Sequence, residues 1–215
     1  MTLNYIGSKK KLLPFIDYVI TQNIKENGTF GDLFAGTGIV GEYFSNKGFT
    51  ITANDTEKYS YVINYATLIS TYNKNVKTYI DELNELKGVK GLIYKNYSPN
   101  GNRKFFTEEN AMIADSIRIR IEELKNDDKI NVNEYYFLLA SLIQSLDKVA
   151  NTTSVYGAFL KKFKKSSLNK LTLIPIHKND KKSNNIILNK SVLEFKNNID
   201  VIYLDPPYVT RQYGA

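Results

Sequence analysis

A strand–turn–helix–strand pattern over residues 29–55 constrains the fold more than any other feature of this sequence. Residues 29–34 predict a short buried strand, and a glycine turn, Ala35-Gly36-Thr37-Gly38, follows it directly. The next residues predict a helix over 39–47 and a second strand over 49–55. Because about thirty residues in this order form the repeating unit of parallel sheets, the sequence predicts an α/β domain.

The remaining strand signals show that this domain is interrupted. Apolar residues at helical spacing predict a helix over residues 9–27, ended by Gly28 as a C′ glycine. Further strand patterns return only at residues 185–188 and 200–204, near the far end of the chain. The parallel sheet is therefore expected to take its strands from both ends of the chain.

The long middle region predicts helices rather than strands. Apolar residues three and four positions apart favour helices near residues 57–87, 107–126 and 132–150. The polar, turn-rich residues 94–103 favour a loop. We therefore predict a sheet domain split by a mostly helical insertion, with three parts: residues 1–70, 71–183 and 184–215.

Composition excludes several classes of chemistry. The 215 residues include no Cys and a single His, His177, which effectively excludes disulfides, thiolate or His-based metal sites and catalytic triads. No signal-peptide pattern opens the sequence, and no apolar run approaches the roughly 18 residues of a membrane span. We expect a cytoplasmic protein without metal or membrane contact, whose chemistry is carried by carboxylates, hydroxyls, amides and the backbone.

Positive charge is concentrated in one segment. Residues 151–190 hold nine Lys and one acid, Asp180, although the whole chain has a formal net charge of only +7. A local basic stripe on a neutral body is typical of proteins that contact a polyanion. A solvated Lys-rich loop explains the charge equally well, so the stripe supports a nucleic-acid partner only together with other features.

The glycine turn predicts a nucleoside ligand. Asp32 lies near the end of the first strand, Gly36 and Gly38 let the backbone approach a ligand, and the next helix presents unpaired N–H groups. Asp55 ends the second strand, where a carboxylate can accept hydrogen bonds from both hydroxyls of a ribose. The three-glycine fingerprint of pyrophosphate cofactors is missing, which favours S-adenosyl-L-methionine. An ordinary βαβ turn with a chance Asp is the alternative.

The most specific motif is Asp205-Pro206-Pro207-Tyr208, which directly follows the last predicted strand. Ligands bind at such carboxyl ends of parallel strands. Two prolines stiffen the turn and remove N–H donors, so the Asp205 carboxylate and the Pro206 carbonyl dominate as acceptors. Two acceptors that hold the hydrogens of an aromatic amine favour its attack on a sulfonium methyl group. Tyr208 can stack on a base that has been flipped out of a duplex.

Together these motifs resemble the Dam-like, alpha-class DNA adenine-N6 methyltransferases. The resemblance rests on Asn4-Tyr5-Ile6-Gly7-Ser8-Lys9, on the turn Asp32-Leu33-Phe34-Ala35-Gly36-Thr37-Gly38 and on the Asp-Pro-Pro-Tyr motif, and it spans the chain. It implies a Rossmann-like methyltransferase sheet with a helical target-recognition insertion. It also implies S-adenosyl-L-methionine as cofactor and catalysis by Asp205, Pro206, Pro207 and Tyr208. The implied cofactor-binding residues are Tyr5, Lys9, Asp32, Phe34, Ala35, Gly36, Gly38, Asp55 and Asp205.

The resemblance implies partners as well. These are double-stranded DNA with a flipped target adenine, and a cognate restriction endonuclease of the same restriction-modification system. The candidate DNA-contacting residues are Arg103, Lys104, Asn151, Lys161, Lys162, Lys164, Lys165 and Arg211. Two departures stand out: Ser191 lies where relatives often carry an Asp near the cofactor adenine, and relatives continue with further strands after the catalytic motif. We therefore expect a fragment of a longer protein, with little or no methyl transfer by itself.

Other functions stay open at this point. N4 methylation of cytosine uses the same amine chemistry, but the motif order and an Asp rather than a Ser before the prolines favour adenine. Methylation of RNA or of a protein amide is a further alternative, and the basic insertion argues against the protein amide. A non-catalytic DNA-binding half that needs a partner chain is the alternative from a different class.

Overall fold

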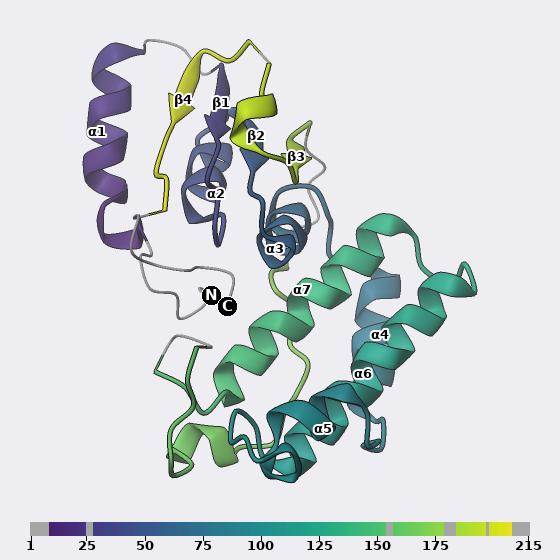
Figure 1. The fold of residues 1–215 in the computed structure, drawn as a ribbon. Helices are drawn as coiled ribbons and strands as arrows, with labels where there is room; N and C mark the ends of the chain where they lie inside the picture. Colours follow the sequence, from purple (N-terminus) through teal and green to yellow (C-terminus); the bar gives the residue numbers. More distant parts are fainter. Residues whose placement is uncertain (1–8, 25–27, 154–156, 179–183, 197, 208–215) are drawn as a thin grey trace. The chain divides into compact units, whose positions relative to one another are not determined.

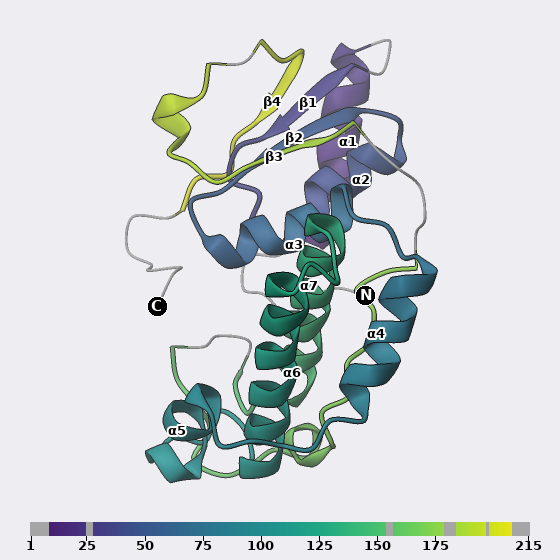
Figure 2. The same cartoon turned by 90° about the vertical axis from the view of Figure 1, so that its right-hand side faces the viewer.

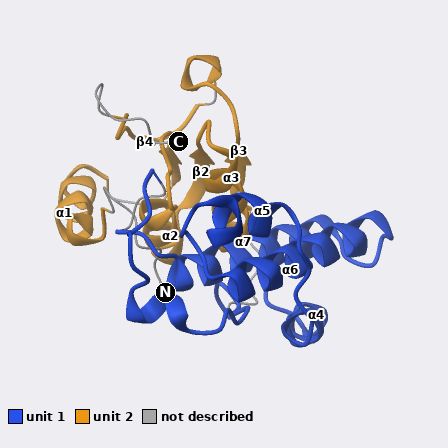
Figure 3. Ribbon diagram, turned by 60° about the horizontal axis from the view of Figure 1, so that its bottom comes forward, with its two compact units in different colours: residues 1, 3–6, 71–180 blue, residues 2, 7–70, 181–215 orange. Residues whose placement is uncertain are grey.

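The computed structural model describes residues 9–24, 28–153, 157–178, 184–196 and 198–207 (Figure 1). It divides into two compact units, coloured separately in Figure 3. The sheet unit lies within residues 7–70 and 181–215, and the helical unit lies within residues 71–180. The predicted α/β class, a parallel sheet accompanied by a mostly helical segment, is confirmed.

The sheet unit is built on four parallel strands in the order β3-β2-β1-β4. Strand β1 lies in the middle with β2, and its Asp32 stands opposite Ala53 of β2 and Tyr203 of β4. Because the strands are parallel and in register, their carboxyl ends meet at one edge of the sheet. The strands are β1 (Thr29–Asp32), β2 (Thr50–Asn54), β3 (Ile186–Leu188) and β4 (Val201–Tyr203).

Helices cover one face of this sheet. Figure 2 shows α1, α2 and α3 on the same side of the strands. Phe30 of β1 and Phe44 of α2 stack with ring centroids 4.4 Å apart, and Phe49 meets both rings edge-on. The helical elements of the unit are η1 (Lys9–Lys11), α1 (Leu13–Asn23), α2 (Ile39–Asn46), α3 (Lys58–Leu68) and η4 (Val192–Glu194). On alternate strand positions, Ile186 and Ile202 remain about half exposed.

The prediction that Gly28 ends the first helix is wrong. Helix α1 ends at Asn23, and Gly28 instead lies directly before β1. A Cβ atom at Gly28 would lie 2.4 Å from Oδ2 of Asp200. This carboxylate accepts hydrogen bonds from the backbone N–H and the hydroxyl of Thr29, which lower the pKa of Asp200. Glycine is therefore needed here for close approach between the starts of β1 and β4, not for a helix end.

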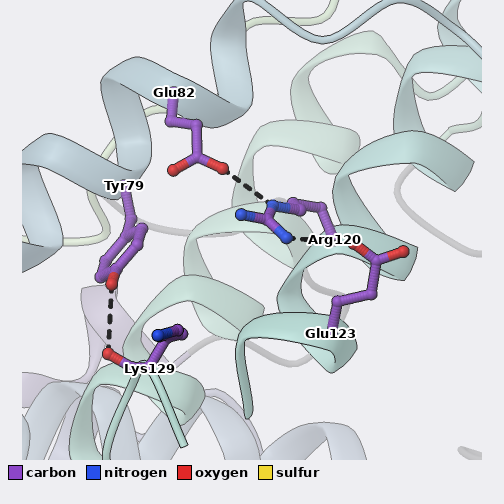
Figure 4. Close-up of polar contacts among 5 residues, drawn as sticks. All are labelled: Tyr79, Glu82, Arg120, Glu123 and Lys129. Carbon is purple, nitrogen blue, oxygen red and sulfur yellow. Dashed lines mark hydrogen bonds and ion pairs between the residues drawn. The ribbon is translucent and has the colours of Figure 1, made fainter. Parts of the chain in front are cut away.

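The helical unit is organised around the long helices α6 and α7. An Asn131–Glu134 capping box begins α7, in which each side chain accepts from the backbone N–H of the other residue. Figure 4 shows Arg120 of α6 paired with Glu82 of α4 (2.8 Å) and with Glu123 (3.2 Å). The unit contains α4 (Lys74–Asn84), α5 (Leu92–Tyr97), η2 (Pro99–Gly101), α6 (Glu108–Asn126), α7 (Val132–Val149) and η3 (Lys165–Leu168).

An irregular segment after η3 is fixed by side-chain amides. Leu171 and Leu173 are almost fully buried, so their backbone groups need partners inside the protein. Asn84 accepts from the N–H of Leu173 (2.7 Å) and donates to its carbonyl (3.0 Å), while Asn110 accepts from the N–H of Leu171 (2.8 Å). The segment is thereby held against the helices without forming a strand or helix of its own.

The expectation of a loop over residues 94–103 is wrong for its first part. Helix α5 begins at Leu92, and the buried carboxylate of Asp115 on α6 accepts from the N–H groups of Gly91 (3.0 Å), Ile93 (2.8 Å) and Tyr94 (2.8 Å). These are the donors that the first turn of a helix leaves unpaired. The cap comes from another helix, which explains why local sequence reasoning missed this short helix.

We predict that Asp115→Ala unfolds α5 locally and lowers the free energy of unfolding by about 2–3 kcal/mol, because several buried N–H groups lose their acceptor. Hydrogen exchange at residues 92–97 and urea denaturation measure the two effects. Asp81→Ala is the matched control: Asp81 forms an exposed ion pair with Lys77, and its loss should change stability by less than about 0.5 kcal/mol. Unchanged protection of residues 92–97 in Asp115→Ala would contradict the assigned cap.

Candidate active site

Three carboxylates gather at the carboxyl edge of the sheet. Asp32 ends β1, Asp55 follows β2 directly, and Asp205 lies two residues beyond β4. Asp32 is 1% exposed, and its Oδ1 has no hydrogen-bond partner among the described residues. Burial, together with the nearby charges of Asp55 and Asp205, raises the pKa of Asp32 to about 7. The structure therefore brings together, around one buried acid, the cofactor and catalytic motifs that the sequence predicts.

The glycine turn is held by Asp55. Both Gly36 (φ +51°) and Gly38 (φ +76°) have left-handed backbone conformations, which explains the need for glycine. Oδ2 of Asp55 accepts from the N–H of Gly36 (2.8 Å), and its Oδ1 accepts from the N–H of Glu57 (2.9 Å). The backbone thus fixes the orientation of this carboxylate. Phe34 is half-buried and Ala35 is buried on the same turn.

The Asp205 turn, predicted to be catalytic, meets Lys9 of the N-terminal motif through an ion pair. Nζ of Lys9, in η1, lies 2.8 Å from Oδ2 of Asp205, and both side chains are mostly buried. Pro206 and Pro207 are exposed beside it. Two further predicted residues of this site, Tyr5 and Tyr208, lie outside the described residues. The ion pair thus joins the Asp205 turn to the last residue of the N-terminal motif.

Sequence reasoning missed three buried polar residues at this edge. Asn54 donates to the carbonyls of Leu33 (3.3 Å) and Lys190 (3.0 Å), and it thereby ties the ends of neighbouring strands. Ser60 and Asn64 on α3 both donate to the carbonyl of Gly36. Small polar residues four positions apart on an otherwise apolar helix face were the signal that could have identified the second pair.

Most of the predicted DNA-contacting residues lie in the helical unit and are exposed. Nζ of Lys104 donates to the carbonyl of Lys161 (3.1 Å), which joins two segments far apart in the sequence. Lys164 is half-buried, and its Nζ donates to the carbonyl of Thr152 (2.8 Å). Arg211 lies outside the described residues. The exposed members are Arg103, Lys104, Lys161, Lys162 and Lys165.

The buried position of Asn151 does not fit the predicted contact with a DNA groove. Its side chain is 0% exposed. Its amide donates to the carbonyls of Lys104 (2.9 Å) and Leu160 (2.9 Å), and its Oδ1 accepts from the N–H of Lys164 (3.0 Å). These contacts occupy the whole amide group of Asn151 within the loop. We therefore infer that Asn151 orders the basic segment, and it is not among the residues proposed below to contact DNA.

The part of the chain that the structure describes shows neither a metal-binding cluster nor a membrane-spanning helix. Its Asp, Glu and His side chains form no group of three that could hold a metal ion. Its helices include none with the length and hydropathy of a membrane span.

Comparison with known proteins decides the family. A family model described as D12 class N6 adenine-specific DNA methyltransferase matches residues 5–215. The chain belongs to this family. The resemblance inferred from the motifs is thereby confirmed, and no solved structure matches the chain.

Curated relatives are similar over almost the whole chain. It is 42% identical to the Type II methyltransferase M.NlaIII of Neisseria lactamica and 40% identical to M.CviAII of Paramecium bursaria Chlorella virus 1, over 99% of its residues in each case. The chain spans 66% of the length of each of these relatives. It is also 35% identical to the Type II methyltransferase M.FokI of Planomicrobium okeanokoites, over 98% of its residues and 35% of that protein.

We predict that Asp32 makes the stability of this protein depend on pH. Its folded pKa, about 7, lies above the ordinary pKa of 3.8, so its stabilising contribution is full below about pH 4 and is lost as the pH rises through 7. Relative to that of Asp32→Asn, the free energy of unfolding of the wild-type chain should fall by about 3 kcal/mol between pH 5 and pH 8. Urea denaturation at both pH values measures this difference.

The exposed Asp81 provides the control, because Asp81→Asn should shift stability equally at both pH values. A stability difference between wild type and Asp32→Asn that stays constant from pH 5 to pH 8 would show that Asp32 is ionised normally.

Proposed function

We propose that this protein transfers a methyl group from S-adenosyl-L-methionine to N6 of adenine in a specific DNA sequence, as the modification enzyme of a restriction-modification system. The observation that carries the proposal is the meeting of Asp55 and the glycine turn with Asp205 at one edge of the sheet. Membership of the adenine-specific family supports the target base, and the Type II methyltransferases among its relatives support the biological setting.

The residues at this edge fit a positively charged nucleoside cofactor. Asp32 keeps a buried oxygen without a partner among the described residues, and Asp55 and Asp205 add negative charge beside it. Opposite charge nearby would favour the ionised form of Asp32. When bound, S-adenosyl-L-methionine supplies a methyl group activated by a sulfonium charge. The residues proposed to hold it are Tyr5, Lys9, Asp32, Phe34, Ala35, Gly36, Gly38, Asp55 and Asp205.

The Asp205 turn is proposed to activate the target amine. Oδ2 of Asp205 binds Lys9. Oδ1 of Asp205 is then proposed to accept a hydrogen bond from the exocyclic amine of the base. The carbonyl of Pro206 is the proposed second acceptor, because prolines supply no competing N–H in this turn. Acceptors on both hydrogens stabilise the positive charge that develops on the nitrogen during transfer. Tyr208 is proposed to stack on the flipped adenine.

The helical unit is proposed to recognise duplex DNA. Its exposed basic residues Arg103, Lys104, Lys161, Lys162 and Lys165 would bind phosphates and supply affinity that is independent of sequence. A restriction endonuclease with the same recognition sequence is the proposed partner in the cell.

The cofactor and target-base roles are tested by two substitutions. Asp55→Ala should weaken binding of S-adenosyl-L-methionine by at least tenfold, because an oriented charged acceptor and the anchor of Gly36 are both lost. Asp205→Ala removes one proposed cofactor contact but leaves Asp55 and the glycine turn intact, so it should weaken cofactor binding by no more than about threefold and abolish whatever methyl transfer the wild-type chain shows. Calorimetry measures binding, and nucleoside analysis of DNA treated with labelled cofactor measures transfer. N4-methylcytosine as the product, or transfer retained by Asp205→Ala, would refute the proposal.

The DNA-binding role predicts an effect of charge reversal in one place only. Changing Lys161, Lys162 and Lys165 to Glu should weaken binding to a DNA duplex at low salt and reduce the steepness of its salt dependence. Fluorescence anisotropy over a salt series measures both quantities. Changing the exposed Lys74, Lys87 and Lys129 to Glu makes the same change in net charge elsewhere in the helical unit. Equal losses in the two triple variants would exclude the basic segment as the interface.

A further inference from the structure

Hydrogen bonds engage both backbone groups of Gly36, its N–H and its carbonyl. Its N–H donates to Asp55, which lies just before α3. Its carbonyl accepts from the hydroxyl of Ser60 (2.6 Å) and from Nδ2 of Asn64 (3.2 Å), both on α3. With the N–H and the carbonyl of this left-handed residue both engaged, the peptide groups on either side of Gly36 are held by Asp55 and by α3.

Ser60 and Asn64 act as one polar unit. They lie four residues apart, on the same face of α3, and are 0% and 1% exposed. Nδ2 of Asn64 also donates to the carbonyl of Ser60 (2.9 Å) and approaches its hydroxyl (3.2 Å). Buried polar groups destabilise a fold unless they are paired. Here the shared acceptor of the pair is the glycine turn itself.

Asn64 also shapes the second glycine of the turn. A Cβ atom at Gly38 would lie 2.4 Å from Oδ1 of Asn64, so this amide fills the space that a side chain would need. Oδ1 of Asn64 has no hydrogen-bond partner among the described residues, although it is buried. The amide is thus placed to fit the turn, at the cost of leaving its own oxygen unpaired.

We propose that Ser60 and Asn64 are positioning residues, which preorganise the Gly36–Gly38 turn for the cofactor. This inference rests on the proposed function, because it assumes that S-adenosyl-L-methionine binds against the turn. A turn that already has its bound conformation loses less conformational freedom on binding. Removing the side chain of Ser60 or of Asn64 leaves Asp55 and the glycines in place but lets the peptide group that contains the Gly36 carbonyl rotate. Cofactor affinity should fall although, among the described residues, the hydrogen bonds of these side chains go only to the turn and to their own helix.

The test compares Ser60→Ala and Asn64→Ala with Ser116→Ala. Ser116 is a matched control, since it is a buried helical serine whose hydroxyl donates to a loop carbonyl, that of Lys87, at 2.6 Å in the helical unit. Ser60→Ala and Asn64→Ala should each weaken binding of S-adenosyl-L-methionine roughly three- to tenfold. Ser116→Ala should keep wild-type affinity while losing comparable stability in urea.

Hydrogen exchange provides a second readout that needs no ligand. Exchange at residues 35–39 should accelerate in Ser60→Ala and in Asn64→Ala, but not in Ser116→Ala. Wild-type affinity and wild-type exchange in the first two variants would overturn the inference alone. Failure of the wild-type chain to bind S-adenosyl-L-methionine would refute the proposed function, and with it the assignment of the turn to that cofactor.

Discussion

The parallel register of β1, β2 and β4 is the constraint on which the site depends. Strands that run in the same direction end at the same edge, so Asp32, Asp55 and Asp205 are brought together although up to 173 residues separate them in the sequence. Burying a carboxylate beside like charges is unfavourable, and the raised pKa of Asp32 reflects first its burial and then the charges of Asp55 and Asp205. The surrounding contacts limit this cost: Lys9 pairs with Asp205, and backbone N–H groups bind Asp55.

The sequence predicts those parts of the molecule that depend on local patterns. Strand, glycine turn and helix follow one another within residues 29–55, so periodicity and turn chemistry were sufficient to predict them. The same holds for the long helices α6 and α7, whose apolar spacing extends over several turns. The motif around Asp205 was predictable because prolines directly after a strand allow few alternatives.

The parts that could not be predicted depend on partners that are distant in the sequence. Helix α5 needs Asp115, which lies more than twenty residues after the helix start. Asn151 has an amide side chain of the kind that reads bases. No local pattern reveals its burial, which makes it part of the loop scaffold. Ser60 and Asn64 likewise gain their meaning only when α3 packs beside the glycine turn. In each case a polar side chain satisfies backbone groups of another segment.

The difference between the parts that the sequence predicts and those that it does not has a physical cause, which also affects the site. Short-range patterns determine where a turn lies, but a left-handed turn such as Gly36–Gly38 has many accessible conformations because glycine is permissive. Long-range hydrogen bonds select one of them. The structure uses Asp55 for the N–H of Gly36 and α3 for its carbonyl, so the two peptide groups that flank Gly36 are fixed by different contacts. Loss of one contact would therefore loosen the turn without unfolding the sheet, whose core of Phe30, Phe44 and Phe49 is independent of both.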